Sequence, residues 1–77
     1  MESAVRNVNL EPDFFEAVDI HTNGLSVKKS SKTAITVSDG KGHLCLEKLG
    51  MGNIWRVWTI NDASNIVATI KEFAGKL

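Results

Sequence analysis

The chain has 77 residues, nine Lys and Arg, nine Asp and Glu, a formal net charge of zero and 43% hydrophobic residues. This composition fits one folded domain and excludes a disordered tail, and the balanced charge argues against a polybasic nucleic-acid binder. A single cysteine excludes an internal disulfide framework, and no apolar run approaches the ~18 residues of a membrane span, so we expect an intracellular, cytoplasmic protein without membrane contact.

The small size of the chain favours self-association. A domain of about 60 to 80 residues buries only about 60% of the surface that its unfolded chain exposes. One unaided core then stabilises the fold by roughly 3–5 kcal/mol. Because a second copy of the chain would add buried surface to this small core, we expect a homodimer.

Residues 1–12 are expected to form a weakly ordered N-terminal arm, and residues 13–77 a single domain. The arm ends at Pro12, which biases Glu11 towards an extended conformation. Phe14 and Phe15 follow directly. They either begin a strand or form one helical turn capped by Asp13, and the sequence leaves both alternatives open.

The strongest short-range turn signal is the dipeptide Asn23-Gly24. Both residues tolerate the positive φ angles of a type I′ turn, which suits a β-hairpin. A two-residue loop would pair Ile20 with Val27 and Asp19 with Lys28. This register places the apolar side chains on one face and a complementary charge pair on the other, so it predicts a hairpin at this site.

Three further strands are predicted from the alternation of apolar and polar residues, at 33–38, 43–48 and 54–60. Glycine-containing turns at 39–42 and 50–53 separate them. The last strand is also rich in β-branched and aromatic residues.

A helix is predicted after the last strand, beginning at a cap formed by Asn61 or Asp62 and running to about residue 74. Ile66, Ile70 and Phe73 form its apolar stripe at helical spacing. The element order indicates an α+β domain: a small antiparallel β-meander of four to five strands with one C-terminal α-helix packed on one face.

The last strand decides what the uncovered face of this sheet presents. Trp55 and Trp58 are three residues apart, so they point to opposite faces of a regular strand. Placing Arg56 in the core would bury an unpaired guanidinium at high cost. We therefore expect Trp55 to face the helix, and Ile54, Arg56 and Trp58 to face away. Arg and Trp are enriched in binding hot spots, so these three residues form the predicted partner-binding site.

Two alternatives for Trp58 stay open at this point. Phe14, Phe15 or the N-terminal arm could cover it, which would make it an ordinary core residue. The same sheet face could instead serve self-association, or recognise a different partner.

The sequence contains no recognisable catalytic set. His43 and Cys45 share one face of a predicted strand, but a Cys nucleophile needs a general base within hydrogen-bond reach, and two such residues arise easily by chance. His21, His43 and Cys45 would meet as metal ligands only if two hairpins were adjacent in the right register. The chain has no phosphate-binding loop. We expect no enzyme activity, no metal and no cofactor.

Basic residues gather near the predicted hairpin. Lys28, Lys29 and Lys32 lie within five positions, and Lys41 lies in the following turn. A basic sheet rim beside an exposed aromatic side chain is one way to hold single-stranded nucleic acid. The order of elements, with the turn around Lys41, is similar in layout to one class of small single-strand-binding domains. The plainer interpretation is that these lysines keep an edge strand soluble.

The sequence thus supports two functional hypotheses. The first is a non-catalytic protein-binding module (an inhibitor, an adaptor or an assembly subunit) that acts through the sheet face not covered by the helix. The alternative is a single-stranded nucleic-acid-binding domain that uses the basic rim and the exposed tryptophan. The residues do not identify the protein partner.

Overall fold

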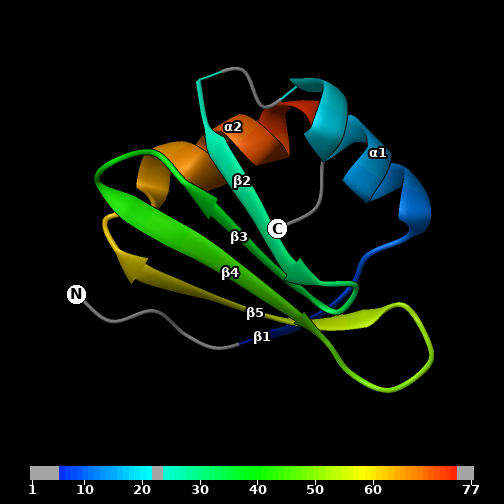
Figure 1. The fold of residues 1–77 in the computed structure, drawn as a ribbon. Coiled ribbons are helices and arrows are strands. Elements are labelled where there is room, and N and C mark those ends of the chain that lie inside the picture. The colour runs from blue at the N-terminus through cyan, green and yellow to red at the C-terminus, as the bar shows by residue number, and fades with distance from the viewer. Residues whose placement is uncertain (1–5, 22–23, 75–77) are drawn as a thin grey trace.

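The fold is a two-layer α+β domain, as predicted. A computed structural model describes residues 6–21 and 24–74, with side chains for 6–18 and 24–72. The elements are β1 Arg6–Asn9, α1 Pro12–His21, β2 Ser26–Ser31, β3 Ala34–Ser38, β4 Gly42–Lys48, β5 Ile54–Asn61 and α2 Ser64–Ala74. The five strands form one antiparallel sheet, and both helices lie on the same side of it (Figure 1). Neither helix is long and apolar enough, over its described residues, to cross a membrane.

The sheet is a four-stranded meander with one strand added out of sequence. β2 to β5 follow one another, and β1 pairs with the outer side of β5, giving the order β1-β5-β4-β3-β2. Residues 6–9, which the sequence analysis assigned to an arm, pair with residues 45 to 51 positions away in the chain, in the register Arg6 with Val57 to Asn9 with Ile54. Helix α1 carries the chain across the sheet from one edge to the other (Figure 1).

The hairpin predicted at Asn23-Gly24 is wrong, because Pro12–His21 is helical. Proline suits the first turn of a helix, where its missing N–H is not needed, and the side chains of Phe14 and Val18 meet one turn apart. Both are buried, at 4% and 5% exposure. Gly24 still adopts a positive φ of 84°, but it leads from α1 into β2. Thr22 and Asn23 lie outside the described residues.

The core lies between the sheet and the two helices. The alternation predicted for the last three strands is confirmed, since one side chain in two on each strand faces the helices. Ile66 and Ile70 of α2 are completely buried, and the side chain of Phe73 lies outside the described part. The buried apolar cluster consists of Leu10, Phe14, Val18, Val37, Leu44, Leu46, Trp55, Val57, Ala63, Ile66 and Ile70.

The turn between β3 and β4 packs against the start of α2. The Asp39 carboxylate accepts hydrogen bonds from the backbone N–H groups of Lys41 (2.9 Å) and Gly42 (3.1 Å). The N–H of Asp62 donates to the Lys41 carbonyl across the junction. Gly42 is buried there, and a Cβ atom at this position would overlap the backbone of Asp62 and Ala63.

Asp62 holds the first turn of α2. Its carboxylate accepts hydrogen bonds from the hydroxyl and the backbone N–H of Ser64, which supplies one of the helix's otherwise unpaired donors with an acceptor. These hydrogen bonds, the hydroxyl first, lower the pKa of Asp62 below its ordinary value, with a smaller contribution from Lys41.

The lowered pKa of Asp62 predicts a loss of stability in acid. A carboxyl group whose pKa falls on folding stabilises the native state above its unfolded-state pKa of about 4, and this contribution disappears as the pH drops through the folded-state value. Asp62→Asn keeps an acceptor oxygen and removes the titration. We expect its free energy of unfolding, measured by urea denaturation from pH 7 to pH 2.5, to change less with pH than that of the wild type. Parallel curves for the two proteins would contradict this role.

Candidate binding face

The sheet face opposite the helices is the candidate functional site, and we call it the open face. No element of residues 6–21 and 24–74 covers it. Antiparallel registers place directly paired residues on the same face, so its members follow from the strand pairing. The open face consists of Asn7 and Asn9 of β1; Ile54, Arg56, Trp58 and Ile60 of β5; His43, Cys45 and Glu47 of β4; Ala34, Thr36 and Ser38 of β3; and Ser26 and Lys28 of β2.

The two tryptophans lie on opposite faces, as the alternation predicts. Trp55 is 5% exposed and packs in the core, with its ring 4.8 Å from that of Phe15. Trp58 is half-buried on the open face, beside Cys45 of β4. Phe14 and Phe15 therefore do not cover Trp58, because α1 brings both to the other side of the sheet. Residues 6–9 lie beside β5, where they extend the face at its edge.

Apolar and charged side chains surround Trp58 along β5. Ile54 and Ile60, near the two ends of this strand, are 41% and 46% exposed. Arg56 lies between Ile54 and Trp58, and its Nη1 atom is 3.7 Å from Oε1 of Glu47 on β4. Both charged side chains are about half exposed, so this ion pair contributes little to stability. All three residues predicted for partner binding thus share one accessible face.

The polar groups of β3 and β4 form separate pairs across the open face. Nδ1 of His43 lies 2.6 Å from Oγ of Ser38. Cys45 is buried, and this burial raises the pKa of its thiol, an effect only partly offset by a side-chain hydrogen bond with Thr36. His43 and Cys45 share a face as predicted, but each is partnered on β3. A raised pKa also leaves less of the thiolate that a nucleophile requires.

The described residues contain no group of three or more His, Cys, Asp or Glu side chains that could hold a metal ion. The side chain of His21, one of the three candidate ligands, lies outside the described side chains. Cys45 is buried against Trp58 and Thr36 in the middle of the sheet, where no acidic side chain pairs with it.

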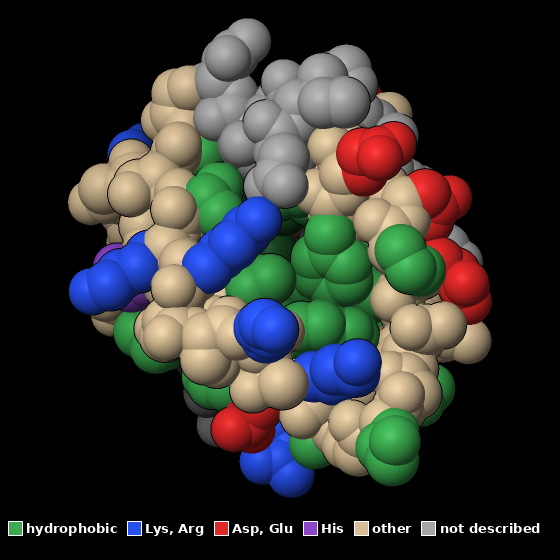
Figure 2. Space-filling model, turned by 45° about the vertical axis from the view of Figure 1, so that its right-hand side comes forward, with side chains coloured by type: hydrophobic (Ala, Val, Ile, Leu, Met, Phe, Trp, Pro, Cys, Tyr) green, Lys and Arg blue, Asp and Glu red, His purple; other side chains and the backbone are tan. Residues whose placement is uncertain are grey.

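The four lysines considered for nucleic-acid binding do not share a face. Lys28 belongs to the open face, whereas Lys29 pairs with Ile35 on the side of the helices. Lys32 lies in the turn between β2 and β3, and Lys41 in the turn at the opposite end of β3. The alternation of side chains along β2 separates the first two. Figure 2 shows basic side chains along one rim of an apolar hollow on the helix side of the molecule.

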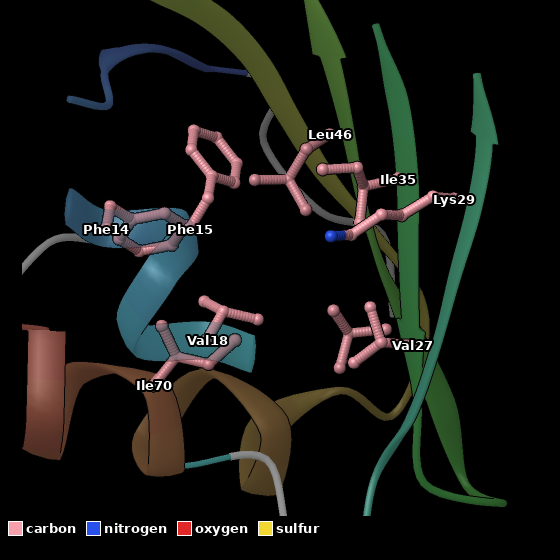
Figure 3. A pocket seen from close by; sticks show the side chains of 9 residues that line it. Phe14, Phe15, Val18, Val27, Lys29, Ile35, Leu46 and Ile70 are labelled. Atoms are coloured by element: carbon pink, nitrogen blue, oxygen red, sulfur yellow. The ribbon is translucent and has the colours of Figure 1, made fainter. Parts of the chain in front are cut away.

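This hollow lies between α1 and the strands β2 and β3. Phe15, Val18, Val27 and Ile35 line it, and the side chain of Lys29 points into it with its ammonium group (Figure 3). Its volume of about 10 Å³ is at most enough for one water molecule, whereas small-molecule sites measure about 300–1,000 Å³. The hollow therefore encloses too little space for a small-molecule ligand of ordinary size.

Three residues of the open face were not identified as site residues from the sequence. Glu47 lies opposite Arg56 because of the register that the turn at 50–53 imposes. Asn7 and Asn9 join the face because β1 pairs with β5. The alternation of Arg6, Asn7, Val8 and Asn9 was the available signal for that strand.

Comparison with known proteins identifies no relative: no family model matches the chain, and no curated protein or solved structure shows significant similarity to it.

Proposed function

We propose that the chain is a non-catalytic protein-binding module that binds its partner through the open face. The observation that supports this proposal is the position of Trp58. It lies half-buried on β5, between β1 and β4 in the strand order, with Ile54 and Ile60 exposed on the same strand and Arg56 between them. A partly exposed aromatic side chain beside Arg, bordered by polar residues, has the composition of a protein interface.

We further expect the module to work inside the cell. Its cysteine is free and buried, and free thiols persist in reducing compartments.

Nucleic-acid binding is the second candidate, favoured by one observation. Lys28 and Arg56 lie on the same face as Trp58, which would allow a base to stack on the indole between phosphate contacts. The pairing of Arg56 with Glu47 and the dispersal of the other three lysines weaken this candidate relative to protein binding.

Substitution of Trp58 tests the proposed function. We expect Trp58→Ser to lose at least 10-fold in affinity for a protein that the immobilised wild-type chain captures from extracts of its source cells. Removing a central aromatic anchor costs about 2 kcal/mol or more in many interfaces. Quantitative mass spectrometry of the captured proteins, followed by titration of the purified partner, gives the measurement.

Met51→Ser is the matched control. Met51 is 99% exposed in the turn between β4 and β5, so this variant should retain the partner. Equal capture by all three proteins would contradict the proposed face. Anisotropy of a labelled single-stranded oligonucleotide tests the second candidate, since binding that weakens with added salt would favour it.

A further inference from the structure

We propose that the open face binds a second copy of this chain, packed face to face about a two-fold axis that runs along the strands between β4 and β5. This inference rests on the proposed function, because it names the partner of the same face. It follows from the strand register, the positions of the charges and the area of the sheet.

The register places four neighbouring pairs across β4 and β5. Glu47 pairs with Arg56, Cys45 with Trp58 and His43 with Ile60. At the end of β4, the N–H of Leu49 donates to the carbonyl of Ile54. Leu49 is the first residue after β4 and lies two residues beyond Glu47, so it continues the open face past the end of the strand. From one end to the other, the pairs are Ile54 with Leu49, the ion pair of Arg56 with Glu47, Trp58 with Cys45, and Ile60 with His43.

A two-fold axis between these strands repeats the same pairs between the copies. In such an interface, if one residue of the first copy contacts a second residue of the other copy, the same contact occurs again with the copies exchanged. With the axis between β4 and β5, β5 of one copy lies over β4 of the other. Arg56 then faces Glu47 of the second copy, Trp58 faces Cys45, and Ile54 faces Leu49. The residue pairs that neighbour each other within one sheet therefore also face each other between the two copies.

The positions of Glu47 and Arg56 make other placements of the two-fold axis less favourable. An axis along β4 would place Glu47 against Glu47, and an axis along β5 would place Arg56 against Arg56. An axis between β3 and β4 would place Arg56 over Ser31 of β2 and Glu47 over Ala34 of β3, so that neither charge meets an opposite one. Like charges in contact are unfavourable, so of these four positions only the axis between β4 and β5 pairs Arg56 with Glu47.

The overlap under this axis involves β1, β5, β4 and β3, and leaves β2 at the margin. Four strands about 4.8 Å apart and about 20 Å long cover roughly 400 Å² of sheet. Standard interfaces bury about 800 Å² on each partner. The dimer is accordingly a weak one, which forms and dissociates with protein concentration, and Lys28 stays in solvent.

The test uses charge reversal in two separate chains. Analytical ultracentrifugation of the wild type over a concentration series should show its mass rising from 8.4 kDa towards twice that value. Arg56→Glu gives a face with two acidic side chains at these positions, and Glu47→Arg a face with two basic ones. Each variant alone should dimerise at least 10-fold more weakly than the wild type. An equimolar mixture of the two should regain the dimer, because acidic faces then meet basic faces.

Rescue by mixing is specific to contact between chains. The ion pair within one chain is lost in both variants and is not restored by mixing them. Lys28→Glu is the control, since it changes the charge of the open face outside the overlap and should leave dimerisation unchanged. Circular dichroism of each variant excludes unfolding as the cause of a monomer.

Two outcomes would overturn the inference: a wild type that stays monomeric at every concentration, or a mixture that stays as monomeric as its components. If Trp58→Ser nevertheless loses a captured partner that the Met51→Ser variant retains, the second copy is wrong as partner while the proposed function stands. If the chain neither self-associates nor depends on Trp58 for capture, both proposals fail.

Discussion

Gly42→Ala is expected to lower the free energy of unfolding by about 3 kcal/mol or more, at or above the upper end for overpacked positions. The added methyl group would overlap the backbone at Asp62 and Ala63, where the β3–β4 turn meets the start of α2. Backbone atoms cannot turn away as a flexible side chain can, so β4 and the helix must separate. A core of this size stabilises the fold by only roughly 3–5 kcal/mol, and the variant should be largely unfolded at room temperature.

Urea denaturation followed by circular dichroism measures this effect, with Gly52→Ala as the matched control. Gly52 is exposed in the turn between β4 and β5, its φ is not positive, and a Cβ atom there meets nothing within 4 Å. The control should stay within about 0.5 kcal/mol of the wild type, as is usual for surface positions. If both variants were equally stable, the close approach at Gly42 would not constrain the fold.

Trp55→Ala and Trp58→Ala should differ sharply in stability, although they remove the same side chain from the same strand. Trp55 is 5% exposed and packs on Phe15, so its loss leaves a cavity and should cost about 3–5 kcal/mol. Trp58 is half-buried on the open face, where water can fill the space that its ring leaves. We expect its loss to cost less than half as much in the same denaturation experiment.

Trp58→Ala also separates the two interpretations of this side chain. A folded variant that no longer binds its partner would establish Trp58 as a binding residue. If Trp58→Ala instead unfolded the chain as completely as Trp55→Ala, the indole would be part of the core, and the open face would lose its central anchor.

Local patterns were sufficient to predict β3, β4, β5 and α2. Each depends on an alternation or a helical stripe within about ten residues, and on glycines in the intervening turns. The sheet face on which Arg56 and Trp58 lie was also predicted locally, from the cost of burying a guanidinium.

The elements that were missed depend mainly on contacts distant in the sequence. Residues 6–9 form a strand because β5 offers its outer edge, and nothing near residue 9 indicates that edge. The Asn23-Gly24 signal is compatible with a hairpin and with the end of a helix. The burial of Phe14 and Val18 against α2 and the sheet favours the helix over the hairpin. The opposition of Glu47 and Arg56 likewise required the register of a whole hairpin.

The pairing of β1 with β5 has a consequence for how the chain folds. The first strand of the sheet finds its partner only after nearly all the intervening chain is available, and β5 is also the neighbour of β4. During synthesis, β1 has no strand to pair with until β5 has left the ribosome. Contacts between such distant segments slow folding relative to helical proteins of the same length. The pairing of β1 with β5 can therefore form only after the rest of the sheet has been synthesised.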